Sequence, residues 1–126
     1  MSFFIGNVEI KNKICIAPMA GITNKTFRKI CESMGAGLVV TEMISAEALV
    51  RDNKKTIDMI EIEDSNIPVS VQLFGSEVST MVSASKFLCE NFPSLKIIDI
   101  NMGCPVPKVA IKNNAGSNLL RYPDKV

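Results

Sequence analysis

Residues 68–105, PVSVQLFGSEVSTMVSASKFLCENFPSLKIIDINMGCP, contain the pattern that decides the fold. Two short apolar runs, Val69–Leu73 and Ile97–Ile100, have the composition of strands that are covered on both faces. Between them, apolar residues recur at helical spacing after an expected N-cap at Ser76, and Pro93 ends the helix. A strand, a helix and a strand in this order predict two parallel strands joined by a right-handed crossover.

The same alternation extends toward the N-terminus. The run Leu38–Thr41 predicts another buried strand, and a helix capped by Thr23 or Asn24 precedes it. The apolar face of that helix would consist of Phe27, Ile30, Cys31 and Met34. A less regular helical region follows from Ser45 to about Ile60. Near the start we expect a hairpin around the polar turn Lys11–Lys13 that runs into a buried strand. Its strands would be Val8–Ile10 and Ile14–Ile16.

About four parallel strands with intervening helices fit two α/β architectures, an open doubly wound sheet and a (β/α)8 TIM barrel. A dinucleotide-binding doubly wound sheet would carry GxGxxG after its first strand, whereas this chain reads Ala17-Pro18-Met19-Ala20-Gly21 there. The barrel is therefore the better interpretation. A complete barrel needs roughly 200 residues or more, so residues 1–126 are expected to form its N-terminal half, preceded by the hairpin.

Composition excludes several classes of function. The net charge is +1, from 14 basic and 13 acidic residues, which gives no global signature of a nucleic-acid-binding protein. There is no histidine, so Ser-His-Asp and Cys-His machinery is excluded within this chain. The four cysteines form no CxxC pair, and no metal site is predicted. Without a signal-like start or a membrane-length apolar run, we expect a reduced, cytoplasmic setting.

Ligands of parallel α/β folds bind at the carboxyl ends of the strands. The residues at these positions are Pro18 and Met19, Glu42 and Met43, Gln72, and Asn101 to Pro105. The amide of Gln72 both donates and accepts hydrogen bonds, as the edge of a flavin ring requires, although it could equally satisfy a loop backbone. Pro18 and Met19 offer a rigid turn and an apolar surface for a flat ring, with core packing of Met19 as the alternative.

Cys104 differs from the other cysteines because it lies in a Gly-Cys-Pro loop at this rim. Cys15, Cys31 and Cys89 lie in an apolar strand or on apolar helix faces, and we interpret them as small buried hydrophobic residues. An ordinary thiol is mostly protonated at neutral pH, which suits proton donation. Nucleophilic attack would require a cationic neighbour, for which Lys108 is the nearest candidate in sequence.

Several of these segments together resemble the tRNA-dihydrouridine synthases, particularly the bacterial B-type branch. The matching segments are Ala17 to Asn24 with Phe27-Arg28, Thr41-Glu42-Met43, Val71 to Gly75, Asp99 to Pro105, and Ala115-Gly116-Ser117 with Leu119-Leu120 and Pro123. They follow one another in order over nearly the whole chain. Asn-Met-Gly-Cys-Pro at 101–105 is the most specific of them, since Ala-Pro-Met occurs in other flavin barrels.

The resemblance implies an FMN-dependent oxidoreductase that takes electrons from NADPH and reduces uridines in tRNA to 5,6-dihydrouridine. In that family a hydride from reduced FMN goes to C6 of the uracil and the loop cysteine protonates C5. Carried over, Cys104 would be the general acid, while Pro18, Met19, Ala20 and Gln72 would bind the flavin. Asn101 would hold the substrate base or position the loop. The uridine must be flipped out to reach the flavin.

The resemblance also implies missing parts. The family's C-terminal half-barrel, its flavin phosphate loops and its helical tRNA-binding domain have no counterpart here, so residues 1–126 would be the N-terminal half of the FMN-binding catalytic domain. We expect this chain alone to have little activity, to contact tRNA mainly through the missing regions, and to self-associate through uncovered apolar surfaces. The alternatives are another FMN barrel, of the dihydroorotate dehydrogenase type, and a non-catalytic half-barrel fragment.

Overall fold

The computed structural model describes all of residues 1–126. Its strands are β1 (Phe3–Ile5), β2 (Val8–Ile10), β3 (Cys15–Ile16), β4 (Leu38–Val40), β5 (Ile44–Ser45), β6 (Val69–Phe74) and β7 (Ile97–Ile100). The α-helices are α1 (Lys25–Ser33), α2 (Ala46–Val50), α3 (Lys54–Asp58), α4 (Val78–Asn91) and α5 (Pro107–Ala110), followed by the 3₁₀ helices η1 (Gly116–Arg121) and η2 (Pro123–Lys125). None of the helices is long and apolar enough to span a membrane.

The main sheet is parallel, and its strands lie side by side in the order of the sequence. Strand β3 pairs with β4, and β4 and β5 both pair with β6 along one edge, so they act as one interrupted strand. Strand β7 pairs with the opposite edge of β6. A doubly wound sheet would reverse its strand order at a switch point. The sequential order therefore confirms the expected half of a (β/α)8 barrel.

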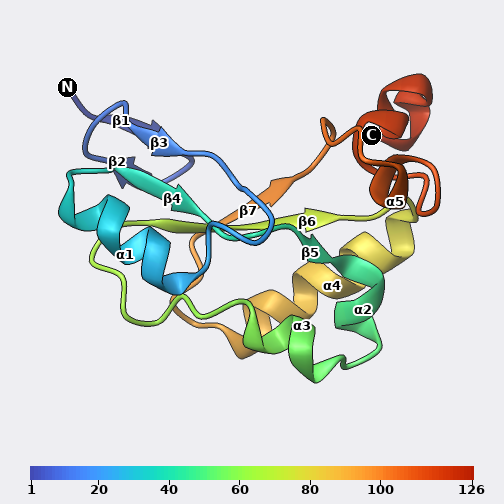
Figure 1. Cartoon of the computed structure of the whole chain (residues 1–126), viewed down its shortest axis with the longest axis horizontal. Coiled ribbons are helices and arrows are strands. Elements are labelled where there is room, and N and C mark those ends of the chain that lie inside the picture. The colour runs from blue at the N-terminus through green and yellow to red at the C-terminus, as the bar shows by residue number, and fades with distance from the viewer.

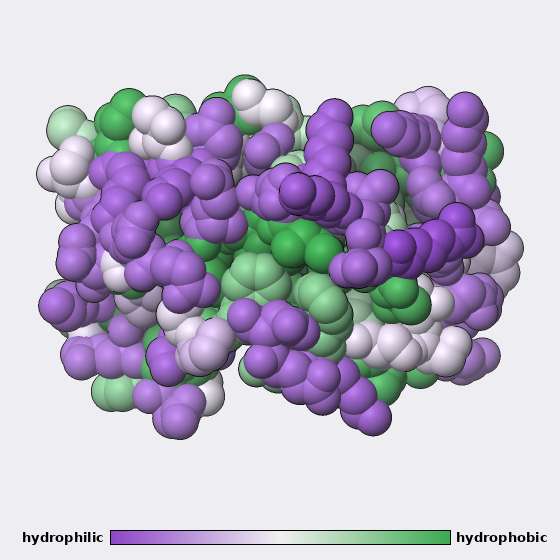
Figure 2. Space-filling view, turned by 90° about the horizontal axis from the view of Figure 1, so that it is seen from below, coloured by the Kyte–Doolittle hydropathy of each residue, from purple (hydrophilic) through white to green (hydrophobic).

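The helices confirm the same architecture, because α1 to α4 all lie on one side of the sheet (Figure 1). That helical face is largely hydrophilic, with a hydrophobic patch near its middle (Figure 2). The core lies between these helices and the sheet, and β6 runs through its centre. Its fully buried members include Ile44, Leu49, Ile60, Val71, Leu73 and Leu88.

The expected hairpin exists, but its position was predicted wrongly. It joins β1 to β2 across Gly6-Asn7, with Ile5 paired to Val8. Gly6 has a φ of 58°, the left-handed conformation that two-residue hairpin turns demand and that glycine adopts without strain. The segment Lys11–Lys13 is a bend instead of a hairpin turn, since the Asn12 side chain donates to Gly35 O at 2.9 Å.

Helix α1 is capped by Asn24, whose side chain accepts from Phe27 N, one of the two predicted caps. Its expected apolar face is wrong in part, because Ile30 and Met34 are 56% and 81% exposed while Arg28 is buried. No other segment of the chain covers Ile30 and Met34. The side of α1 that faces inward is the one that carries Arg28, whose guanidinium hydrogen-bonds Thr23 O and Glu61 O.

Two other helix boundaries differ from expectation. Helix α4 has Glu77 at its N-cap, without a side-chain cap bond, so Ser76 does not cap it. The helical region from Ser45 divides into α2 and α3, because Asp52 adopts a left-handed φ of 54° and Asn53 caps a new helix by accepting from Thr56 N. Ser45 does cap α2, by accepting from Ala48 N at 3.2 Å.

Candidate active site

An open cleft of about 450 Å³ lies at the carboxyl ends of the parallel strands. Its walls are formed by Pro18, Ala20, Met43, Gln72, Ile100, Asn101, Met102, Gly103, Cys104 and Val106. Five of the six predicted site residues are thus brought together, from the loops after β3 and β7 and from strand β6 itself. Met19 is the exception: the residue is 37% exposed and does not line the cleft.

Gln72 is the centre of a polar network at the floor of the cleft. It is 6% exposed, its Nε2 donates to Asp99 Oδ2 at 2.6 Å, and its Oε1 accepts from Asn101 Nδ2 at 2.8 Å. Asp99 lies directly opposite Gln72 in the β6–β7 register. The amide group of Gln72 therefore has one N–H and one lone pair left for a ligand, the mixed donor and acceptor pattern noted from its residue type.

Asn101 connects this network to the cysteine loop. Its Oδ1 accepts from Gly103 N at 3.2 Å and from Cys104 N at 3.0 Å, while its own backbone N–H continues the ladder to Leu73 O at 2.9 Å. On the other side, Ser117 N donates to Cys104 O at 3.0 Å. The backbone of Cys104 is thus held at both its N–H and its carbonyl, and its half-buried thiol borders the cleft.

The other cysteines are less buried than expected. Cys15 and Cys89 are exposed, so their interpretation as buried hydrophobic residues is wrong, whereas Cys31 is half-buried and packs against the core. Strand β3 is an edge strand, which leaves Cys15 uncovered. None of the three lines the cleft, so Cys104 is the thiol at the site. Lys108 is exposed in α5 and does not line the cleft either.

The turn after β3 contributes Pro18 and Ala20 to the wall of the cleft. The Thr23 hydroxyl is buried and accepts from Met19 N at 3.0 Å, and it also donates to Met19 O at 3.2 Å. The carboxylate of Glu42, from the loop after β4, accepts from Gly21 N. These bonds fix the backbone of the turn, in which Pro18 and Ala20 line the cleft and Met19 does not.

Met43 and Met102, which the sequence placed at strand ends without a role, add apolar surface to the cleft. Asp99 was given no role from the sequence, and it orients Gln72. The sequence does distinguish Asp99, because it is the one charged residue within the otherwise apolar strand β7. Its pairing with Gln72 depends on the β6–β7 register, which the sequence does not display.

This arrangement suits a flat heteroaromatic ligand. One wall offers proline, alanine and methionine side chains, the floor offers amide donors and acceptors, and a thiol lies at the side. The lining contains no lysine or arginine, so it offers no cationic side chain for a phosphate group.

Fold and site together define a class of protein: half of a parallel β/α barrel whose rim carries a cysteine and two amides around an apolar cleft. Residues 15–126 match the family model described as dihydrouridine synthase. The chain belongs to the dihydrouridine synthase family.

Individual relatives agree with this assignment. The chain is 47% identical over 123 residues to "tRNA-dihydrouridine synthase B" of Vibrio cholerae, a match that covers 97% of this chain and 37% of that protein. It is 45% identical over 123 residues to "tRNA-dihydrouridine synthase B" of Escherichia coli K12, with the same two coverages, 97% and 37%. The chain therefore spans just over a third of the length of these curated relatives.

Proposed function

We propose that this chain is the N-terminal part of the catalytic barrel of an enzyme that reduces uridines in tRNA to dihydrouridine. The observation that carries the proposal is the convergence of Cys104, Asn101 and Gln72 on one cleft at the carboxyl ends of the strands. Membership of the dihydrouridine synthase family supports the reaction, and the names of the relatives support tRNA as its substrate.

The cofactor in this proposal is FMN, reduced by NADPH. Pro18 and Ala20 would lie against its ring and Gln72 would hydrogen-bond its edge through the free N–H and lone pair of the amide. When bound and reduced, FMN supplies the hydride that the uracil accepts at C6. The phosphate would bind to residues beyond those that line the cleft, because none of them is basic.

Cys104 is the proposed general acid. As C6 of the uracil gains a hydride, negative charge develops toward C5, and the Cys104 S–H bond breaks to give C5 its proton. The resulting thiolate is reprotonated from solvent. The backbone bonds of Cys104 to Asn101 and Ser117 hold the thiol in place for this transfer. Asn101 would orient the loop and the edge of the base.

The test uses two proteins. One is the chain of 126 residues; the other, the extended form, is this chain continued with the residues that follow the matched region in the Escherichia coli relative. FMN is titrated into both, with flavin fluorescence as the readout, and dihydrouridine in tRNA is measured with NADPH present. We expect the extended form to bind FMN and form dihydrouridine, and the shorter chain to have little activity.

Each outcome has a consequence. If neither protein binds FMN, the flavin assignment of Pro18, Ala20 and Gln72 is wrong and the proposed function falls with it. Turnover by the shorter chain would refute the expectation that it is inactive alone, while leaving the reaction itself supported.

A further inference from the structure

Arg28 is the only residue with a formal charge among the buried side chains, and it is 4% exposed. Its position on α1 gives no reason for burial, because apolar residues of the same helix remain in solvent. Burial of a charged group is costly unless its hydrogen-bonding atoms find partners. The contacts of Arg28 therefore need an explanation beyond core packing.

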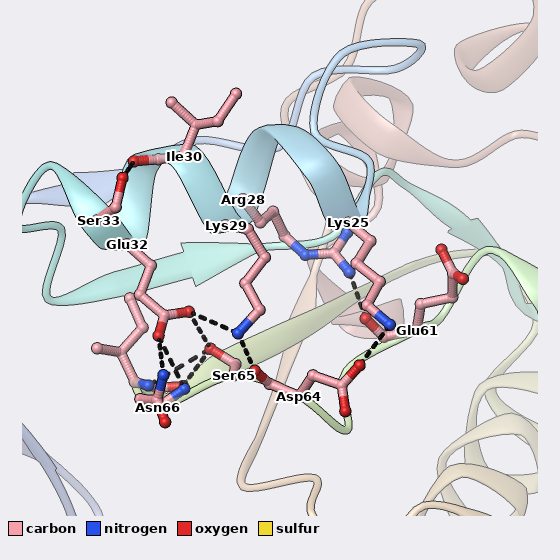
Figure 3. Close-up of polar contacts among 11 residues, drawn as sticks. Lys25, Arg28, Lys29, Ile30, Glu32, Ser33, Glu61, Asp64, Ser65 and Asn66 are labelled. Carbon is pink, nitrogen blue, oxygen red and sulfur yellow. Dashed lines mark hydrogen bonds and ion pairs between the residues drawn. The ribbon is translucent and has the colours of Figure 1, made fainter.

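The guanidinium bonds two backbone carbonyls from different segments. Nη1 donates to Thr23 O at 2.6 Å and Nη2 donates to Glu61 O at 2.6 Å. Figure 3 shows the side chain reaching from α1 to the loop that contains Glu61. The planar fork of arginine can serve two acceptors at once, which a lysine ammonium on a flexible stem does less well.

Thr23 connects Arg28 to the residues that line the cleft. Its hydroxyl bonds both the N–H and the carbonyl of Met19, and Met19 lies between the cleft residues Pro18 and Ala20. Arg28 is thus two contacts from the wall against which the flavin ring is proposed to lie. It touches no cleft residue itself.

Two carboxylates, those of Glu61 and Glu42, interact electrostatically with Arg28. Burial lowers its pKa from the ordinary value, and the carboxylates of Glu61 and Glu42 oppose that change. Glu42 also accepts from Gly21 N in the same turn. The cation and this carboxylate therefore hold the turn between them, Arg28 at Thr23 and Glu42 at Gly21.

We propose that Arg28 is a positioning residue that holds the Pro18–Thr23 turn in its ligand-binding conformation. Its significance for the flavin rests on the proposed function, whereas its effect on the turn does not. The proposal is tested at both levels.

The first measurement is amide hydrogen exchange in the 126-residue chain itself. In Arg28→Met, we expect the amides of Met19 and Gly21 to exchange at least about tenfold faster relative to amides of β6, because the turn has lost its anchor. Lys29→Met is the matched control, because Lys29 lies on the same helix but does not hydrogen-bond the turn. It donates to the backbone carbonyl of Asp64 and forms an ion pair with Glu32. Arg28→Lys should lie between the two, and it replaces Arg28→Met if that variant does not fold.

The second measurement is FMN affinity in the extended form, with each variant shown to be folded. We expect the dissociation constant to rise about 10- to 100-fold in Arg28→Met, less in Arg28→Lys and not at all in Lys29→Met. Unchanged exchange at Met19 and Gly21 would overturn the positioning role. Normal FMN affinity in a folded Arg28→Met would do so as well, while leaving the proposed function intact. An unmodified extended form that binds no FMN would refute the proposed function, and the exchange result alone would then decide whether Arg28 holds the turn.

Discussion

At the scale of single residues, Cys104 is fixed by its backbone while its thiol stays at the cleft. In the extended form, we expect Cys104→Ala to bind FMN normally and to lose about 10²- to 10⁴-fold in dihydrouridine formation, because only the general acid is removed. Turnover on tRNA and flavin titration measure the two effects separately. Cys89→Ala is the control, because Cys89 is exposed and does not line the cleft. Equal turnover in the two variants would contradict the assignment.

Gly116 gives a second prediction at this scale, because it lies against the cysteine loop. A Cβ placed on Gly116 would meet Cys104 O at 2.5 Å, and its φ of 54° disfavours other residues. Gly116→Ala should therefore lower the free energy of unfolding by about 2 kcal/mol or more, measured by urea denaturation. Gly103→Ala is the control for stability, since nothing lies within 4 Å of its Cβ position. Equal stability of the two variants would show that the loop yields without cost.

In the extended form, Gly116→Ala should also reduce dihydrouridine formation more than FMN binding. The reason is that a displaced Cys104 carbonyl moves the thiol, whereas Pro18 and Gln72 stay in place. A loss of FMN affinity as large as the loss of turnover would indicate a general collapse of the cleft instead.

At the scale of elements, α1 is tied to the loop of residues 61–66 by a set of polar contacts (Figure 3). The Glu32 carboxylate accepts from Asn66 N at 3.0 Å, from Asn66 Nδ2 at 2.7 Å and from Ser65 Oγ at 3.0 Å. Burial of Glu32 raises its pKa, but the bonds from Asn66 and Ser65 and the charge of Lys29 together outweigh it and lower the pKa below 4.5.

This lowered pKa predicts a pH dependence of stability. The contribution of Glu32 is present above the unfolded-state pKa and is lost as the pH falls through the lower folded-state value. The free energy of unfolding should therefore decrease below about pH 4.5, and Glu32→Gln should flatten that decrease. Part of the decrease should remain in Glu32→Gln because of Asp64, whose pKa is also lowered, by the hydrogen bond and the charge of Lys25.

Urea denaturation at several pH values provides the measurement. Glu90→Gln is the matched control, because Glu90 is exposed and takes no part in the contacts between α1 and the loop of residues 61–66. The interpretation fails if Glu32→Gln and Glu90→Gln show the same slope between pH 5 and about pH 3.

The elements also show where sequence patterns succeed. The apolar runs that became β4, β6 and β7 were predictable because strands covered on both faces need continuous apolar residues. The hairpin was misplaced because both Gly6-Asn7 and Lys11–Lys13 resemble turns, and only the contact of Asn12 with Gly35 separates them. Burial of Arg28 was not predictable, since its carbonyl partners are far apart in sequence.

At the scale of the whole molecule, large apolar side chains remain in solvent. An apolar groove of about 550 Å³ lies between α4, β7 and the C-terminal segment, and its lining includes Val78, Val82, Ile100 and Val126. Strands β3 and β7 each pair on one side only. Surfaces of this kind promote association.

We therefore predict that the 126-residue chain self-associates at micromolar concentrations. Sedimentation velocity should show species larger than the monomer. Val82→Lys should shift the distribution toward monomer by placing a charge in the groove, and Ser83→Lys on the exposed side of α4 serves as the control. A clean monomer at all concentrations would refute the prediction.

The sequence by itself determined the alternation of strands and helices, the barrel class, the positions of Pro18, Asn101 and Cys104 after strand ends, and that of Gln72 in the last half of its strand. It could do so because periodicity and turn residues are local properties of a chain. Only the tertiary structure decided that Met19 does not line the cleft, that Asp99 orients Gln72, and that Arg28 is buried. Those features depend on strand register and on loops that meet across the sheet, and such distances in space are not encoded in the spacing of residues along the chain.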